Sequence, residues 1–513
     1  MHLNKSNIKI NPLFGIIATI MVTILGMLLV YIAGNARGFN PSFVVLMRNA
    51  LMMCAFLLVY FILKPNYKGD FAILVVVAFI TGLGFVVQYR ISAAINVNFQ
   101  ETLINQYSAA AIKKMQADSL NAAGAHVDSL KANLSQTTRY NTIKSEAKEF
   151  LKLDSFRFNQ VIGEFFRSVP GWSRVIVSFL IALFSIVYIV KKCARDEFMD
   201  SLSKPFFWVA LTIMLLVLFV VLSEVKTRGR FVYQMTPWEA FKITIIIFLA
   251  GFFAQYKDDL LRKRPKIKGK RIQRLLIPWG PFIAIWMIPQ FLFVLLKDFG
   301  QVIIYGGLVV VMIFVVTRRY IYLFGGLGVT IISTKLIMLS ESFLPPHVMQ
   351  RFKIWSDLWA LPHNSAWWDN VYQIMNSFFA LKAGGLTGTG LGLGYPTNVP
   401  LVVSDFVYAA IAEELGFIGA FVLLFCYLVL FLLGMCVVID AKNDFEKLLA
   451  VGFSSMLAIQ VFVNIGGVIK LIPLTGITLP FISRGGFSFL ISFIIIGFLM
   501  GLSHRNGRKT LEA

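Results

Sequence analysis

A lone acidic residue, Asp405, stands between a glycine-dense run and a long apolar segment. The glycines fall between residues 383 and 394, and the apolar segment carries two further acids, Glu413 and Glu414. Ionisable groups at the mouth of a membrane helix are costly to keep, so they commonly mark chemistry. Asp405 could act as a general base or hold a divalent cation such as Mg²⁺ or Mn²⁺. Either Asp405 or Ser404 could instead cap the helix that follows.

The other acids suit structural roles better. Glu413 lies two helical turns beyond Asp405, about 12 Å along the axis, which is too far for direct acid–base partnership. Glu239 and Lys242 are three apart on one helix and can pair there. Asp298 could form a salt bridge or contact a substrate. The residues expected in structural roles or internal ion pairs are Glu239, Lys242, Asp298, Glu413 and Glu414.

The glycine run could bind phosphate through exposed backbone N–H groups. It lacks the Lys-Ser/Thr ending of a Walker loop and the strand–helix setting of a nucleotide fold. We therefore expect it to form a tight re-entrant turn in the loop before Asp405.

Composition places these residues in a membrane protein. The chain has 513 residues, of which 58% are hydrophobic and 14% are charged. Apolar runs long enough to cross a bilayer core about 30 Å thick recur along it. We predict an all-α polytopic membrane protein with about twelve transmembrane helices. The expected spans are 13–33, 43–63, 71–88, 175–190, 206–222, 238–255, 275–296, 301–317, 320–340, 405–437, 447–469 and 483–502.

The distribution of Lys and Arg orients the spans. The densest basic loop, residues 257–274, follows the sixth span, and positive charge is retained on the cytoplasmic side. Both termini are therefore expected in the cytoplasm. This bias and anionic membrane lipid account for the net charge of +22, so we expect no nucleic-acid partner. The segments expected outside are 89–174, 223–237, 341–404 and 470–482.

The order of spans and polar segments divides the chain into units. The one sizeable polar insertion, residues 91–172, has amphipathic stretches that suit a solvated cap or partner platform better than a catalytic domain. The expected units are two N-terminal transmembrane helices at 1–68, a core at 69–505 that contains this insertion, a large extracytoplasmic loop at 341–404 before the tenth span, and a cytoplasmic tail at 506–513.

Four short motifs follow one another along the chain. They are Thr236-Pro237-Trp238-Glu239 with Lys242, Lys297-Asp298-Phe299-Gly300-Gln301, the glycine run with Ser404-Asp405-Phe406 and Ala412-Glu413-Glu414-Leu415-Gly416, and Asn464-Ile465-Gly466 with the segment from Pro473 to Gly486. Each motif alone is weak. In this order they resemble the SEDS (shape, elongation, division and sporulation) family of peptidoglycan glycosyltransferases, represented by RodA and FtsW.

The resemblance runs from Phe71 to Arg505 and implies a ten-helix core preceded by two additional helices. It implies polymerisation of lipid II into glycan strands at the outer face of the bacterial cytoplasmic membrane, in cell elongation or division, with Asp405 as the catalytic residue. The implied partners are lipid II, a lipid-linked glycan strand and a class B penicillin-binding protein, which is a transpeptidase. One departure lies between Pro400 and Asp405, where the acid and the histidine usual in the family are missing. This argues against a mechanism in which that histidine assists the aspartate.

The resemblance also suggests which residues bind substrate. A departing pyrophosphate needs cations on the outer face, and Arg can grip phosphate with two parallel hydrogen bonds. Gln373 and Ser377 match the family's Gln-X-X-X-Ser element and could orient sugar hydroxyls. The residues expected to bind substrate are Arg351, Gln373, Ser377, Lys382, Ser404 and Arg484.

Two other functions fit the same sequence. A transporter that flips lipid II would use ionisable groups across the full membrane depth, such as Glu239, Lys242 and Glu413, together with broken helices. A non-catalytic scaffold could recruit cell-wall proteins through residues 91–172, but it would have no need of Asp405. An acid near the outer surface favours chemistry over transport.

Overall fold

The computed structural model describes residues 11–37, 41–93, 171–204, 238–260, 298–326, 346–357, 365–484 and 486–511, with a few single positions between 287 and 328. The described residues form helices and turns and no strand, which confirms the all-helical class. The labelled elements are α1 Pro12–Ala36, α2 Phe43–Leu63, α6 Gly171–Cys193, α7 Asp196–Leu202, α9 Trp238–Leu260, α11 Phe299–Thr317, α13 Pro346–Ser356, α14 Ser365–Gly384, the 3₁₀ turn η2 Pro396–Asn398, α15 Val407–Asp440, α16 Asp444–Val468 and α17 Gly486–Leu511.

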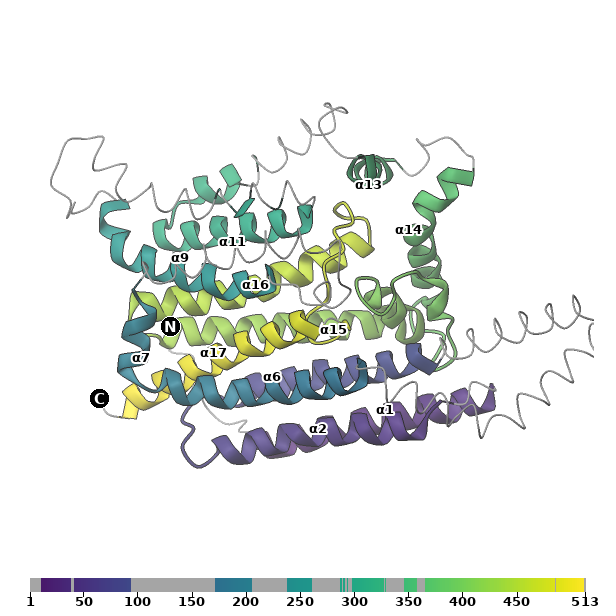
Figure 1. Ribbon diagram of the computed structural model, residues 1–513, viewed down its shortest axis with the longest axis horizontal. Coiled ribbons are helices and arrows are strands. Elements are labelled where there is room, and N and C mark those ends of the chain that lie inside the picture. The colour runs from purple at the N-terminus through teal and green to yellow at the C-terminus, as the bar shows by residue number, and fades with distance from the viewer. Residues whose placement is uncertain are drawn as a thin grey trace, which may run out of the picture.

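Long apolar helices lie side by side and form the body of the protein (Figure 1). Eight helices in the described ranges are long and apolar enough to cross a membrane. They are α1, α2, the helix Ala72–Ala93, α9, α11, α15, α16 and α17. In addition, α6 packs against α2 and α17 within the same bundle.

The expected spans that fall in the described ranges coincide with helices. The expected span 447–469, for example, is observed as α16. The count of twelve stays a prediction, because three spans lie wholly or mostly outside the described residues. Segments of which the structure describes little or nothing include the expected spans 206–222, 275–296 and 320–340, the insertion 91–172 and the outer segment 223–237.

The helix α16 lies at the centre of the bundle and contacts α9, α11, α15 and α17. Small residues let its neighbours come close. A Cβ added at Gly452 would lie 2.6 Å from the Ile246 side chain of α9, and one at Gly434 of α15 would lie 2.1 Å from the Ser454 hydroxyl of α16. Close approach of this kind is the usual basis of helix packing in membranes.

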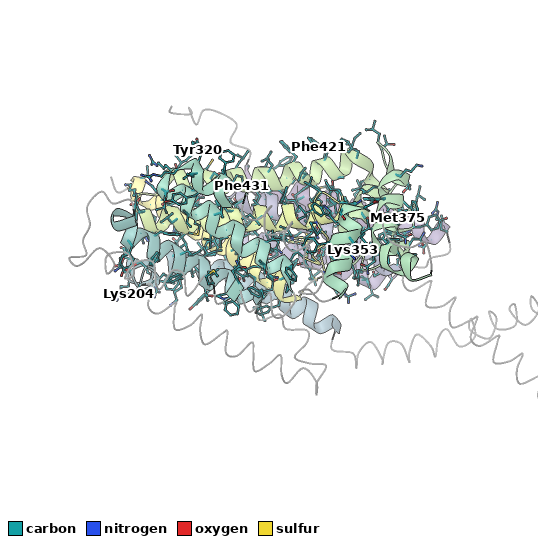
Figure 2. The ribbon with its side chains drawn as sticks, turned by 90° about the horizontal axis from the view of Figure 1, so that it is seen from above. Lys204, Tyr320, Lys353, Met375, Phe421 and Phe431 are labelled. Atoms are coloured by element: carbon teal, nitrogen blue, oxygen red, sulfur yellow. The ribbon has the colours of Figure 1, made fainter. Side chains whose placement is uncertain are left out.

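One side of α15 is apolar and faces outward. Phe417, Phe421 and Phe425 are 63%, 55% and 54% exposed, and Figure 2 shows Phe421 at the edge of the bundle. Exposed aromatic surface of this extent is unfavourable in water but suits contact with lipid chains. This helix therefore lies at the lipid-facing edge of the bundle.

Part of the expected loop 341–404 is helical, which the sequence interpretation did not foresee. It contains α13, α14 and η2, and Figure 1 shows α14 upright beside the ends of the bundle helices. Val371, Ile374, Ser377 and Ala380 of α14 are buried at intervals of three, so a single face of this helix packs inward.

The helix α17 continues to Leu511, so most of the expected tail at 506–513 belongs to this helix. The Asn506 side-chain amide donates a hydrogen bond of 3.1 Å to the carbonyl of Val437 in α15. Many basic residues gather at this end of the bundle, including Lys64, Lys68, Lys191, Lys192, Arg195, Lys442, Arg508 and Lys509. The turn that carries Asp405 lies at the opposite end of α15.

Candidate active site

Asp405 lies in the turn immediately before α15. Its side chain is only 7% exposed, and the Ser404 hydroxyl donates a hydrogen bond of 2.6 Å to its Oδ1. The other oxygen, Oδ2, faces Gly476, where a Cβ would lie 3.9 Å away. Because Gly476 is exposed, the carboxylate is shielded on most sides but lies close to the surface at this glycine.

Asp405 does not cap α15. The helix begins at Val407 with Phe406 in the cap position, and the cap makes no side-chain hydrogen bond to the helix. The Ser404 hydroxyl is directed to the Leu401 carbonyl at 3.1 Å and to Asp405. The capping role considered from the sequence is therefore not realised, and the carboxylate remains available for another role.

Two side chains hold the backbone around Asp405. The Asn464 amide of α16 donates to the carbonyl oxygens of Asp405 and Ile477, at 2.8 and 2.6 Å. The Ser483 hydroxyl donates to the carbonyl of Ser404. These bonds join the turn to α16 and to the segment between α16 and α17, so the position of the carboxylate is fixed by its surroundings.

Burial dominates the electrostatics of Asp405. Removal from water raises the pKa of the Asp405 carboxyl above its ordinary value, while the Ser404 hydrogen bond and the positive charge of Arg351 offset part of the rise. Arg351 is exposed on α13 and also attracts Asp298. The Arg351 guanidinium thus lies within electrostatic reach of both carboxylates.

Asp298 and the pair Glu239–Lys242 extend this charged region into the bundle. Asp298 Oδ1 accepts a hydrogen bond of 3.3 Å from the Gln301 backbone N–H, so it caps α11. Lys242 Nζ lies 2.7 Å from Glu239 Oε2 and donates to Gln460 Oε1 at 3.1 Å. Both members of the ion pair are buried, which suits a structural role because a buried charge needs a partner.

The glycine run crosses α15 where that helix is interrupted. Gly416 adopts φ +68° inside α15, so the helical hydrogen bonds cannot continue past it. Backbone groups of the run replace the lost helical hydrogen bonds. Two N–H groups of the run donate to carbonyls of α15, and two N–H groups of α15 donate to carbonyls of the run. The crossing bonds are Thr389 N–H to Glu413 O at 2.9 Å, Gly390 N–H to Glu414 O at 3.0 Å, Phe417 N–H to Gly385 O at 2.9 Å and Ile418 N–H to Leu386 O at 3.1 Å.

Only glycine fits at the tightest points of this crossing. A Cβ at Gly384 would lie 1.9 Å from the Ala412 carbonyl oxygen, and one at Gly388 would lie 2.2 Å from that of Glu414. The N–H groups of Thr389 and Gly390 are already used by α15. The run therefore forms a close structural turn here rather than a phosphate-binding loop.

Glu413 and Glu414 fasten the end of the run to α15. Glu414 Oε1 lies 2.9 Å from Arg90 Nε in a buried ion pair, and Arg90 Nη2 donates to the Gly394 carbonyl at 2.8 Å. Glu413 Oε1 accepts the Tyr395 backbone N–H at 2.7 Å. The internal salt bridge expected at Glu413 is formed by its neighbour instead, because the Arg90 guanidinium reaches Glu414.

The N-terminal helix α1 contacts the outer side of the same run. Arg37 Nη1 donates a hydrogen bond of 2.8 Å to the Leu393 carbonyl, and its guanidinium lies 5.9 Å from the centre of the Tyr395 ring. A Cβ at Gly392 would lie 2.8 Å from the Cβ of Ala33. Two arginines from helices early in the chain therefore hold the run in place.

The other expected substrate-binding residues divide into two groups. Arg484 and Lys382 are exposed, and the Arg484 backbone N–H donates to the Val403 carbonyl at 2.9 Å beside the Asp405 turn. Ser377 is a correction: it is fully buried, and its hydroxyl donates to the Ile374 carbonyl at 2.8 Å, so it cannot reach a sugar. Gln373 is partly exposed on α14.

Sequence reasoning missed the roles of Arg90, Arg37 and Asn464. A signal was present for Arg90, because a charged residue at the end of an apolar span needs an internal partner. Asn464 lies in a recognised motif, but its double hydrogen bond depends on how α16 meets two distant turns. Arg37 follows an apolar span, where an interface anchor is the ordinary interpretation.

From the sequence, Asp405 could hold a divalent cation, and the residues around Asp405 show what kind of cation site is available. Among the described residues, no three His, Cys, Asp or Glu side chains gather as a metal site. Mg²⁺ is commonly held by one or two carboxylates together with substrate phosphates. Asp405 could provide such a single carboxylate to a cation carried by a pyrophosphate.

Comparison with known proteins places the chain in a family. The profile of the FtsW/RodA/SpoVE cell cycle proteins matches residues 155–508. The chain belongs to this family. Peptidoglycan glycosyltransferase RodA of Mycobacterium bovis is 35% identical over 276 residues, which cover 53% of this chain and 56% of that protein. The probable peptidoglycan glycosyltransferase FtsW of Bacillus subtilis is 32% identical over 280 residues, covering 53% and 64%.

Membership in the FtsW/RodA/SpoVE family confirms the resemblance drawn from the four motifs. The match spans little more than half the length of the mycobacterial relatives. A solved structure described as "Structural coordination of polymerization and crosslinking by a peptidoglycan synthase complex" is 22% identical, with a TM-score of 0.49, and covers 66% of this chain and 91% of that one. Helices α1, α2 and Ala72–Ala93 precede the residues matched by the family profile.

Proposed function

We propose that this protein is a peptidoglycan glycosyltransferase that polymerises lipid II into glycan strands. The observation that carries the proposal is the Asp405 carboxylate, held by Ser404, shielded from water and within electrostatic reach of Arg351. A carboxylate with a raised pKa is a stronger base than an ordinary aspartate when it is ionised. Names of relatives such as RodA and FtsW support the same reaction.

The proposed reaction uses Asp405 as a general base. Its Oδ2 takes the proton of the acceptor sugar hydroxyl while that oxygen attacks the anomeric carbon of the lipid-linked donor. The new glycosidic C–O bond forms as the bond to the donor pyrophosphate breaks, and the lipid pyrophosphate leaves with the bonding electrons. Arg351 and Arg484 are the proposed cations that stabilise the departing pyrophosphate. A bound divalent cation would supply further positive charge there.

We place the site at the outer face of the cytoplasmic membrane. The basic residues at the far end of α2, α6 and α17 support this orientation, since positive charge is retained in the cytoplasm. Lipid tails would then remain among the exposed aromatic side chains of α15, with the sugars at the Asp405 turn. A class B penicillin-binding protein is the proposed partner, because polymerised strands need a transpeptidase to crosslink them.

The decisive experiment supplies labelled lipid II to purified protein, with its transpeptidase partner, and measures polymer. We expect Asp405→Asn and Asp405→Ala to lower the rate about 100-fold or more, the usual range for loss of a general base. Asp196→Asn, an exposed acid at the opposite end of the bundle, is the matched control and should remain active.

Folding of these variants can be checked independently. Because the pKa of Asp405 is raised in the folded protein, ionisation costs stability at neutral pH, and this cost persists above the raised pKa. Asp405→Asn removes that charge and should unfold at the same temperature as wild type or higher. Equal polymer from Asp405→Asn and wild type would refute the catalytic role. Lipid II movement across vesicles without polymer from wild type would instead support the transporter.

A further inference from the structure

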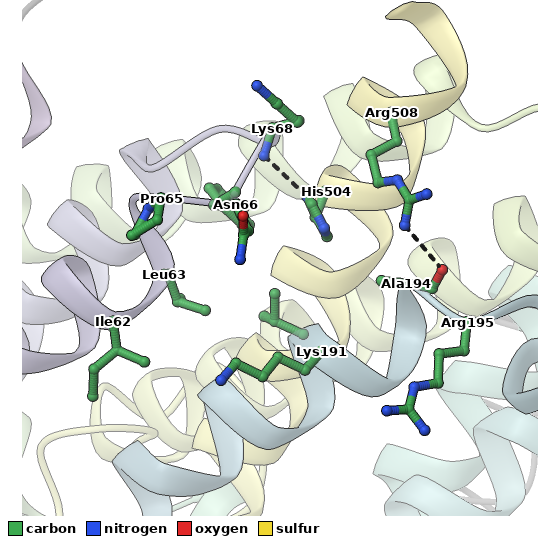
Figure 3. A pocket seen from close by; sticks show the side chains of 12 residues that line it. Ile62, Leu63, Pro65, Asn66, Lys68, Lys191, Ala194, Arg195, His504 and Arg508 are labelled. Carbon is green, nitrogen blue, oxygen red and sulfur yellow. Dashed lines mark hydrogen bonds between the residues drawn. The ribbon is translucent and has the colours of Figure 1, made fainter. Parts of the chain in front are cut away.

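A cavity of about 580 Å³ lies far from Asp405, at the other end of the bundle (Figure 3). Its walls are the end of α2 with the turn that follows, the end of α6 and the last turns of α17. At 1.5 Å per residue, His504 on its wall is about 27 Å along α17 from the start of that helix beside Arg484. The cavity is therefore separate from the proposed catalytic site.

Cations surround the mouth of this cavity. Lys68, Lys191, Arg195 and Arg508 all line it and are exposed, and the lining described by the structure includes no Asp or Glu. Arg508 Nη1 donates to the Ala194 carbonyl at 3.5 Å, which directs its guanidinium across the opening (Figure 3). Four positive charges gathered around one hollow favour a ligand that carries negative charge.

The deeper wall of the cavity is apolar. Leu63 and Val190 are buried there at the ends of α2 and α6, and Ile62 beside them is 51% exposed. The apolar residues belong to helix ends, and the cations lie on the last turns or just beyond them. A ligand that fits both parts has a charged head and a hydrocarbon portion.

The wall formed by the turn after α2 is firmly attached to α17. The Lys68 backbone N–H donates to His504 Nδ1 at 2.9 Å, and the Tyr67 ring stacks on the His504 ring with centroids 5.4 Å apart. A Cβ at Gly69 would lie 2.7 Å from the His504 backbone nitrogen. The turn and α17 are thus in contact without a ligand, and the cavity between them is already formed.

Asp70 and Asp196 lie close in sequence to the lining residues Lys68 and Arg195, but neither acid lines the cavity. Asp196, at the start of α7, forms an ion pair with Arg505, and Arg505 Nε also pairs with Glu446 Oε1 at 2.8 Å. Arg505 therefore neutralises acids of α7 and α16. Arg508 also attracts Asp196, and it lines the mouth together with Lys68, Lys191 and Arg195.

We propose that this cavity binds the phosphate-bearing headgroup of an anionic phospholipid in the adjoining leaflet. The phosphate would lie among Lys191, Arg195 and Arg508, and an acyl chain would follow Ile62 along the outside of the bundle. Basic pockets between helix ends on the cytoplasmic side suit such headgroups. A free phosphate shares the charge but makes no use of the apolar wall, so the lipid is the favoured source.

The test measures lipid binding to delipidated protein in neutral detergent by native mass spectrometry. The probes are phosphatidylglycerol, phosphatidylcholine and inorganic phosphate. We expect phosphatidylglycerol to bind wild type selectively and the variant Lys191→Gln/Arg508→Gln to bind it about 30-fold more weakly, from the usual effect of two basic residues near a lipid surface. The variant Lys191→Arg/Arg508→Lys should bind within about threefold of wild type, because it keeps both positive charges at the cavity.

A matched control removes the same charge from the same end outside the cavity. Arg319→Gln/Lys442→Gln should keep the affinity of wild type, because both residues are exposed and neither lines the cavity. If the control lost as much affinity for phosphatidylglycerol as the cavity variant, the binding would depend on general surface charge, and the proposal would be overturned. Binding of phosphatidylcholine or of inorganic phosphate as tight as that of phosphatidylglycerol would also overturn it. Thermal unfolding in detergent alone verifies that every variant is folded.

Discussion

At the scale of single residues, the proposed chemistry depends on how strongly Asp405 holds a proton. Burial raises its pKa, and Ser404 and Arg351 act against that rise. The sequence could suggest Asp405 because an acid at a helix mouth is unusual, but it could not reveal that Arg351 attracts both Asp405 and Asp298. That convergence is created by tertiary packing of residues far apart along the chain.

The raised pKa predicts the pH dependence of polymerisation. Asp405 must be ionised to accept a proton, so the rate should fall as pH drops through its pKa. The acidic limb of kcat/KM should lie above the value of about 3.9 of an ordinary aspartate. The measurement is initial polymerisation rate over the range in which the protein stays folded. A limb at or below the ordinary value would show that burial does not govern this carboxylate.

Replacing Ser404 tests the hydrogen bond to Asp405 directly. The Ser404 hydroxyl stabilises the ionised carboxylate, so Ser404→Ala should raise the pKa further and move the acidic limb up by about one pH unit. The rate on the high-pH plateau should change much less than the limb. Ser404→Thr, which keeps a hydroxyl, serves as the control. A purely structural role for Ser404 would lower the plateau and leave the limb in place.

At the scale of elements, the glycine run and α15 form one unit through their crossing hydrogen bonds. The sequence predicted a tight turn for the run, since so many glycines disfavour regular helix. The interruption of α15 could not be predicted, because residues 407–440 are mostly apolar on both sides of Gly416 and hydropathy does not register a single backbone angle. The apolar composition predicted that residues 407–440 form a helix, but it did not predict the contact between this helix and the glycine run.

Alanine substitutions in the run should separate close packing from backbone conformation. Gly388 has φ +86°, and a Cβ there would lie 2.2 Å from the Glu414 carbonyl oxygen, so Gly388→Ala should cost about 3 kcal/mol or more of stability. Gly385 has φ +52° but no atom within 4 Å of an added Cβ, so Gly385→Ala should cost only about 1 to 2 kcal/mol. Thermal unfolding in detergent measures both. Similar costs for the two variants would contradict the observed crossing.

At the scale of the whole molecule, the bundle carries its proposed catalytic turn and its basic cavity at opposite ends. Most of this arrangement was predictable, because apolar runs fix the spans and basic residues orient them. The contacts made by α1 with the glycine run were not predictable. They join a helix that precedes the family match to a loop more than 350 positions later, as in the Arg37–Leu393 hydrogen bond at a sequence separation of 356.

Thiol labelling in intact cells tests the orientation. Asn398 and Lys442 are exposed at the two ends of α15. In a background with the native cysteines changed to alanine, Asn398→Cys should react with a membrane-impermeant reagent from outside, and Lys442→Cys should react only after the membrane is permeabilised. The reverse pattern would place Asp405 in the cytosol and contradict the proposed reaction at the outer face.

The crossing at Gly416 also restricts how this segment can change in evolution. Two N–H groups of the run donate to α15, and two N–H groups of α15 donate back, at matched positions on either side of the interruption. An inserted or deleted residue between Gly385 and Gly390 would shift one pair of partners relative to the other and leave backbone amides of the crossing unsatisfied. Side chains in the run can therefore diverge where space permits, but its length should be invariant among proteins that share the interruption.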